Sequence, residues 1–127
     1  MPSRNEQTPQ IVDMLTQAYW MEMETVMNYT AAATNPDGVR ALEVRQSLEE
    51  DIQEELGHAQ KFAHRIKELN GIVPGSLDFS AAQKAMQPPS DTTDIVSVIK
   101  GVLDAENGAI QHYNKIIELC DGVDFVT

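Results

Sequence analysis

The chain has 127 residues, of which 42% are apolar and 23% charged, a size and balance that favour one folded globular domain over a disordered chain. Acidic residues outnumber basic ones 20 to 9, and the formal net charge of -11 argues against nucleic acid or an anionic membrane surface as a partner. The single cysteine, Cys120, excludes a disulfide framework and a cysteine-based metal centre and favours a reducing cytoplasm, and no stretch approaches the roughly 18 apolar residues of a membrane span.

The first predicted helix runs from Thr8 to about Ala33. Thr8 followed by Pro9 is typical of an N-cap with proline at the first helical position. The apolar positions that recur with helical spacing are Ile11, Leu15, Ala18, Val26, Tyr29 and Ala33. A turn cluster, residues 35–38, follows and is so short that the next helix is expected to return antiparallel.

The second predicted helix runs from Val39 to Asn70, with Gly71 and then Pro74 as stop signals. Its apolar face carries Leu42, Ile52, Ala59, Phe62, Ile66 and Leu69. Residues 71–90 form a linker with Gly, Pro and Ser at both ends, and a short helix is expected over residues 79–86.

The third predicted helix begins near Ser90 or Asp91 and ends at Gly122. Its apolar face carries Ile95, Val98, Val102, Ala109, Tyr113, Ile117 and Cys120. The linker before it reaches up to about 66 Å at ~3.3 Å per residue, enough to return along the bundle and set this helix parallel to the second. The pattern therefore predicts an all-α chain with the long crossover of ferritin-like bundles.

Each predicted helix carries a glutamate in line with its apolar residues: Glu22, Glu55 and Glu106. His58 follows Glu55 by three residues, so the two side chains share one helix face. Ionised carboxylates in an apolar core cost several kcal/mol each unless a cation or a proton compensates them. A site rich in oxygen with one imidazole suits iron, or manganese. Any one of these glutamates alone has a simpler interpretation as a solvated residue at the edge of its helix, and the metal hypothesis depends on the three together.

These segments resemble those of bacterioferritin and related ferritin-like proteins. METVMNY after Glu22 looks like their first-helix segment, EELGHAQKFAHRI like their second-helix Glu-x-x-His segment, and LDAENGAIQHYNKII like their third-helix segment. The resemblance implies a di-iron centre in which Glu22 and His58 are terminal ligands of one iron, Glu55 is the bridge and Glu106 is a terminal ligand of the second iron. It implies no catalytic residue beyond these metal ligands.

Two features depart from that family. Leu56 stands where the heme-bearing bacterioferritins place a methionine, so heme is not expected. A fourth helix with a second Glu-x-x-His has no counterpart, and the ferritin-like domain over residues 1–127 is expected to be incomplete at its C-terminus. The other helices would then leave an apolar groove open, and another chain is one way to fill it, so at least a homodimer is expected.

The resemblance implies ferrous iron and oxygen or peroxide as the reactants, in iron handling or defence against oxidative stress. The chain is expected to act as a ferroxidase-type oxidoreductase if the ligands of a fourth helix are supplied. Two alternatives remain open: a di-iron enzyme acting on an organic substrate, and a non-catalytic helical module whose groove binds a partner helix.

The sequence also predicts the surroundings of two other histidines and of two glycines in the second and third helices. His64 and His112 lie away from the apolar faces and are expected at the rim or in solvent. Gly57 and Gly108 weaken their helices by roughly 1 kcal/mol each, which indicates tight packing near the site.

Overall fold

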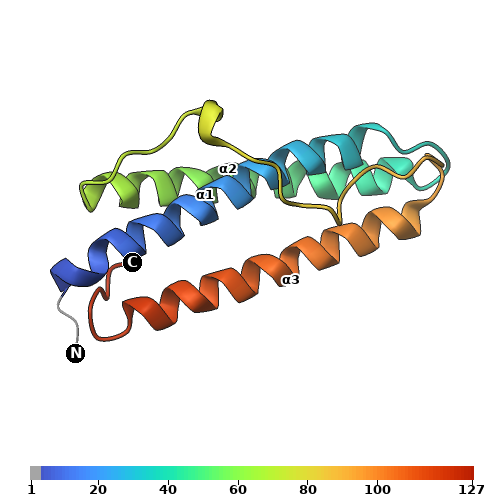
Figure 1. The fold of residues 1–127 in the computed structure, drawn as a ribbon. Coiled ribbons are helices and arrows are strands. Elements are labelled where there is room, and N and C mark those ends of the chain that lie inside the picture. The colour runs from blue at the N-terminus through green and yellow to red at the C-terminus, as the bar shows by residue number, and fades with distance from the viewer. Residues whose placement is uncertain (1–3) are drawn as a thin grey trace.

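The computed structural model describes the backbone of residues 4–127, and side chains from residue 7. Three long helices lie side by side: α1 (Arg4–Thr34), α2 (Ala41–Glu68) and α3 (Ile95–Cys120), with a short 3-10 helix, η1 (Ser76–Asp78), between α2 and α3 (Figure 1). The described residues contain no strand, so the predicted all-α class is confirmed. None of the described helices is long and apolar enough to cross a membrane.

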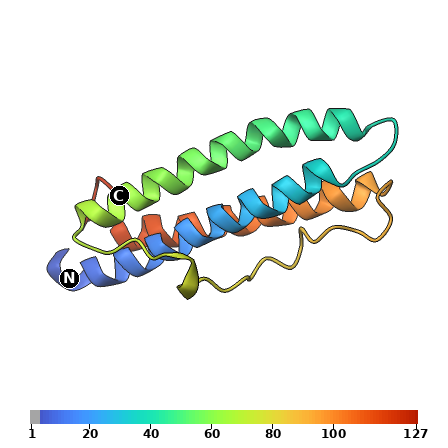
Figure 2. The same cartoon turned by 90° about the horizontal axis from the view of Figure 1, so that it is seen from above.

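The order of the helices in space also follows the prediction. α1 and α2 form an antiparallel hairpin, and the crossover returns along the hairpin so that α3 runs parallel to α2 (Figures 1 and 2). α1 begins a turn earlier than predicted, and Pro9 lies inside it rather than at its first position. Because proline has no N–H, α1 lacks one intrahelical hydrogen bond at this position.

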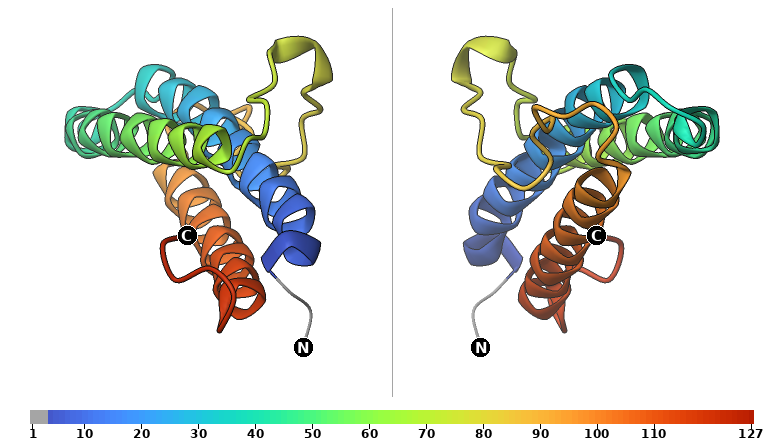
Figure 3. Two further views of the ribbon diagram at one scale, coloured as in Figure 1. Left: turned by 90° about the vertical axis from the view of Figure 1, so that its left-hand side faces the viewer. Right: turned by 90° about the vertical axis from the view of Figure 1, so that its right-hand side faces the viewer.

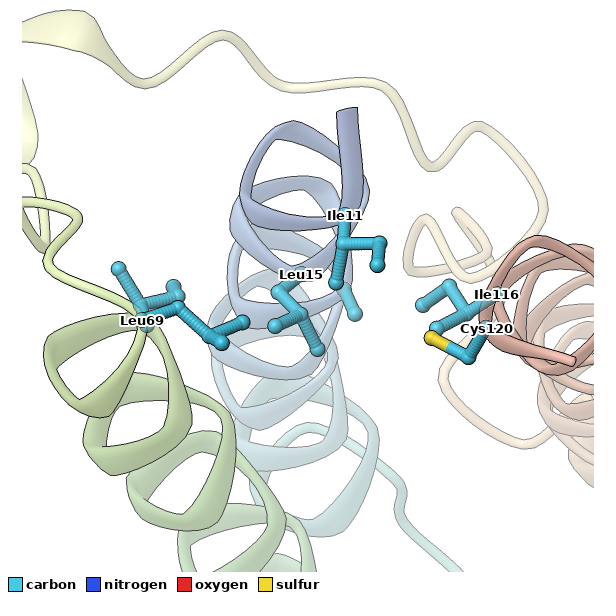
Figure 4. Packing of buried hydrophobic residues seen from close by; sticks show 7 residues of the cluster. Ile11, Leu15, Leu69, Ile116 and Cys120 are labelled. Atoms are coloured by element: carbon cyan, nitrogen blue, oxygen red, sulfur yellow. The ribbon is translucent and has the colours of Figure 1, made fainter. Parts of the chain in front are cut away.

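Two apolar clusters lie toward opposite ends of the bundle. The first joins the start of α1 to the ends of α2 and α3 (Figure 4) and consists of Ile11, Leu15, Ala18, Ile66, Leu69, Ile116 and Cys120. The second consists of Tyr29, Ala32, Ala33, Leu48, Met86 and Val98. Between them along α1 lies the segment that contains Glu22. The predicted apolar faces were wrong at Leu42 and Ile117, which are 59% and 64% exposed.

The crossover is held to α1 by a buried carboxylate. Glu24 accepts hydrogen bonds from the backbone N–H groups of Ala82 (3.0 Å) and Gln83 (2.9 Å). The Gln83 side chain donates to the Met21 carbonyl and to Thr25 Oγ1. The short helix expected over residues 79–86 is absent because these contacts hold the segment in an extended, irregular conformation.

One side of the bundle is open. α1 packs against both other helices, whereas α2 and α3 make little direct contact and diverge (Figure 3). A groove of about 280 Å³ between them is lined by Val44, Leu48, Ile99 and Leu103, among others. The apolar groove expected in the absence of a fourth helix is therefore present.

Candidate metal centre

The bundle brings three of the four predicted ligands together. Glu22 comes from α1, and Glu55 and His58 come from successive turns of α2. One oxygen or ring nitrogen from each of the three side chains lies within 4.8 Å of the others. This is the spacing that side chains need in order to hold one ion between them.

The imidazole faces both carboxylates through one nitrogen. His58 Nδ1 lies 3.8 Å from Glu22 Oε2 and 3.6 Å from Glu55 Oε2. These distances are too long for good hydrogen bonds. The three side chains therefore face one another across a space and are not paired directly. Glu22 Oε2 is buried and has no hydrogen-bond partner, a rare condition for a buried polar atom.

Burial controls the charge of the two glutamates. Glu22 is only 3% exposed, and loss of solvation raises its pKa to about 7, although the nearby His58 works in the opposite direction. Burial likewise raises the pKa of Glu55, and His58 lowers it in part. The His58 side chain is 47% exposed, so the site opens to solvent on the histidine side. A cation would relieve the cost of ionising both carboxyl groups.

Glu106 does not join the group of three, and its predicted burial was wrong because it is exposed. Together with Glu22 and Glu55 it lines a small cavity of about 20 Å³. This volume has room for about one water-sized species. Tyr29 donates a hydrogen bond of 3.3 Å to Glu106 Oε1. Glu106 therefore lies on the α3 wall of the site, held there from α1.

Tyr29 is the functional neighbour that sequence reasoning placed only in the apolar core. Its ring is buried in the second apolar cluster, and its hydroxyl reaches Glu106. Burial, followed by the charge of Glu106, raises the pKa of the Tyr29 hydroxyl. The phenol is therefore a donor to the carboxylate at neutral pH. Its place seven residues after Glu22 was the available signal, because that spacing sets both side chains on one face of α1.

The remaining histidines stay outside the site. His64 is exposed, and His112 Nε2 lies 3.0 Å from the Met14 carbonyl oxygen. The expectation of tight packing at Gly57 and Gly108 was wrong, because a Cβ atom built at either position would meet nothing within 4 Å.

The fold and the site together define a ferritin-like protein, and the comparisons with known proteins agree. Residues 12–127 match the ferritin-like domain family. The chain belongs to this family.

Two relatives illustrate the similarity. The DNA protection during starvation protein of Pyrococcus furiosus is 25% identical over 118 residues, which cover 90% of this chain and 63% of that protein. The chain thus spans less than two thirds of the length of this curated relative. Among solved structures, a ferritin-like, diiron-carboxylate protein from Bacillus anthracis has a TM-score of 0.79 at 19% identity and covers 95% of this chain and 78% of the other. That likeness concerns the fold.

Proposed function

We propose that this protein binds ferrous iron between α1, α2 and α3 and promotes its oxidation by oxygen or peroxide, in iron handling or defence against oxidative stress. The observation that carries the proposal is Glu22 Oε2, a buried carboxylate oxygen without a hydrogen-bond partner, beside Glu55 and His58. A buried, unpaired carboxylate is costly unless a proton or cation accompanies it. Two carboxylates and one imidazole suit iron or manganese better than zinc.

The two relatives support the same function. One is a starvation-protection protein and the other a diiron-carboxylate protein. The name of the first relative includes DNA, but a chain with net charge -11 repels a phosphate backbone, so we do not extend DNA contact to this protein. Ferrous iron persists in a reducing cytoplasm, the compartment that fits a chain with one cysteine.

Each side chain has a proposed role. Glu22 and His58 would hold one metal, Glu55 would bridge to a second, and Glu106 would hold the second metal from α3. Bound iron supplies the one-electron redox chemistry. His58 would offer the metal its Nδ1, the nitrogen that faces both carboxylates, and would then carry its proton on Nε2. Glu22, with its pKa of about 7, would bind the cation in its ionised form. Tyr29 keeps the Glu106 carboxylate in place through its hydrogen bond.

The second metal has only a bridge and one terminal carboxylate in this proposal. The remaining ligands would come from a further helix beyond residue 127 or from another chain. Full turnover therefore requires that supply, whereas binding of the first metal depends on Glu22, Glu55 and His58 alone.

Metal binding and ferrous oxidation test the proposal directly. Anaerobic titration with Fe²⁺ is expected to give at least one tight site in the wild-type chain, and Glu55→Ala or His58→Ala is expected to weaken it by 10-fold or more. The matched controls are Glu54→Ala and His64→Ala, exposed residues of the same types on the same helix, which should retain wild-type affinity. Addition of oxygen or peroxide then measures the oxidation rate.

The possible results separate the alternatives. If iron binds without a measurable oxidation rate until an organic compound is added, the protein acts on that compound instead. If Glu55→Ala and Glu54→Ala bind iron equally, Glu22, Glu55 and His58 are not a metal site and the proposal fails.

A further inference from the structure

The middle of α1 is held by polar contacts as well as by apolar packing. It lies between the two apolar clusters, and four of its polar or charged side chains are no more than 9% exposed: Glu22, Glu24, Thr25 and Asn28. Glu22 and Glu24 are about 200° apart around the helix. Glu22 therefore faces α2, whereas Glu24 faces the crossover on the other side of α1 (Figure 2). This part of α1 thus lies between the candidate metal centre and the crossover.

The crossover reaches the middle of α1 through one glutamine side chain. Gln83 Nε2 donates to Thr25 Oγ1 at 2.7 Å and to the Met21 carbonyl oxygen at 3.2 Å. Gln83 Oε1 accepts from Asn28 Nδ2 at 3.0 Å. The amide therefore has a partner for its two hydrogens and for its oxygen. These partners span seven residues, or about two turns, of α1.

The hydroxyl of Thr25 shows that the glutamine takes the place of a contact within the helix. Thr16 and Thr30 each donate their hydroxyl to the carbonyl oxygen four residues earlier, at 2.8 and 2.7 Å. At Thr25 the corresponding carbonyl, that of Met21, accepts from Gln83 instead. Met21 and Thr25 also line the small cavity of the candidate metal centre. Gln83 therefore holds two residues that form part of the cavity wall.

The same segment of the crossover makes two further contacts with α1. The backbone N–H groups at its start donate to Glu24, and Met86 packs in the second apolar cluster with Tyr29, whose hydroxyl donates to Glu106. We call residues 82–86 the crossover clamp. A buried polar network stabilises a fold only when it is complete, because each unpaired member keeps the cost of its desolvation. The clamp is therefore expected to open and close as a unit.

We propose, on the basis of the proposed function, that Gln83 is a positioning residue of the candidate metal centre and that closure of the crossover clamp is coupled to metal binding. The closed clamp fixes the part of α1 that presents Glu22 to α2, so the open state binds metal more weakly. By thermodynamic reciprocity, a metal that prefers the closed state must also hold the clamp closed. Occupancy of the site is then felt by a segment that contains none of its ligands.

Anaerobic titration of the 127-residue chain with Mn²⁺, at a temperature where every variant is folded, tests the positioning role. Gln83→Ala is expected to bind Mn²⁺ roughly fivefold or more weakly than wild type, although every ligand remains. Gln87→Ala removes an exposed amide that donates within the crossover, and it should bind as wild type does. Ile116→Val lowers stability through the first apolar cluster and should also keep wild-type affinity. A general loss of stability is thereby separated from positioning.

Hydrogen–deuterium exchange tests the reciprocal effect in the wild-type chain. Saturating Mn²⁺ is expected to slow exchange in residues 80–86 by a similar factor relative to EDTA, because the Ala82 and Gln83 N–H groups exchange only when the clamp opens. Residues 72–79, where the Phe79 N–H bonds within the η1 turn, should exchange at an unchanged rate. In Glu22→Gln the effect should disappear, which would assign it to the site rather than to cations over the acidic surface.

Wild type decides the proposed function, and the variants decide the coupling. A wild-type chain that binds neither Mn²⁺ nor Fe²⁺ overturns the proposed function and this inference with it. If wild type binds metal and Gln83→Ala binds it equally well, or Ile116→Val weakens binding as much as Gln83→Ala does, only the positioning role is overturned. Equal exchange of residues 80–86 in Mn²⁺ and in EDTA, with metal bound, overturns the coupling and leaves the iron site standing.

Discussion

Two glutamates two residues apart on α1 are both buried, yet their surroundings give them different roles. Glu24 accepts hydrogen bonds from two backbone N–H groups of the crossover, those of Ala82 and Gln83, which compensate for the water lost on burial. Glu22 faces the α2 side, where one oxygen has no such partner and the pKa rises to about 7. The first carboxylate is therefore a structural anchor, and the second is a site that a cation would stabilise.

The raised pKa of Glu22 predicts a pH-dependent effect of Glu22→Gln in the metal-free protein. The folded pKa of about 7 lies above the ordinary value of 4.5, so between these values the folded state binds more protons than the unfolded state. The free energy of unfolding then falls as pH rises through this window and stays low above it. Glutamine carries no such penalty. Glu22→Gln is expected to stabilise the chain at pH 8, by up to about 3 kcal/mol, and to have little effect near pH 4.5.

Urea unfolding in EDTA at pH 5 and pH 8 measures this difference, with Glu54→Gln as the exposed control on α2. A gain of equal size at both pH values, or a loss at pH 8, would show that Glu22 is not held near neutrality by burial.

For single residues, the sequence predicted Glu22, Glu55 and His58 as neighbours, because helical spacing sets them on the inner faces of an antiparallel hairpin. It did not predict the exposure of Glu106, because α3 packs mainly on α1 and makes little direct contact with α2. The burial of Glu24 was also unforeseen. It depends on backbone N–H groups of a crossover far along the chain, and no side-chain pattern reports them.

Among the structural elements, the crossover depends on one close approach to α3. A Cβ atom at Gly101 would lie 2.5 Å from the Ala85 carbonyl oxygen and 3.2 Å from Met86 Cα. Both contacts are with backbone, which cannot move aside as a flexible side chain can. Gly101 thus permits Met86 to enter the second apolar cluster, and this part of the crossover to lie close against α3.

Alanine at two glycines of α3 should therefore have opposite effects on stability. Gly101→Ala is expected to destabilise the chain by about 1–3 kcal/mol through the clash with the crossover. Gly108→Ala meets nothing within 4 Å and should stabilise it by about 0.5–1 kcal/mol, because alanine favours the helix. Thermal or urea unfolding of the two variants provides the comparison. If both variants gained stability, the crossover would not be held against α3 at this point.

Gly101 and Gly108 show which part of the fold a sequence pattern predicts and which part it does not. Helix positions, the tight α1–α2 turn and the parallel return of α3 all follow from apolar spacing, turn residues and linker length. The sequence pattern does not show which glycine is needed for packing, since Gly57, Gly101 and Gly108 look alike in a helical pattern. The path of the crossover decides among them.

For the whole molecule, the main electrostatic feature is the net charge of -11, which concentrates divalent cations over the surface as well as at any specific site. A specific site and a diffuse cation layer stabilise the fold by different physics. Binding at the buried carboxylates adds stability by mass action, about 2.7 kcal/mol at a hundred times Kd. Cations over the surface only screen repulsion, and added salt replaces them.

Mn²⁺, which oxygen does not readily oxidise, is therefore expected to raise the Tm of wild type by roughly 10 °C at a hundred times Kd, and to keep most of that gain in 0.5 M NaCl. Within each variant, the Tm with Mn²⁺ is compared with the Tm in EDTA, because Glu22→Gln changes the metal-free stability as well. Glu22→Gln and Glu55→Gln should lose the shift that survives high salt, whereas Glu54→Gln should retain it. A shift that disappears in 0.5 M NaCl, or that persists in Glu22→Gln and Glu55→Gln, would assign the stabilisation to the acidic surface rather than to the site between α1 and α2.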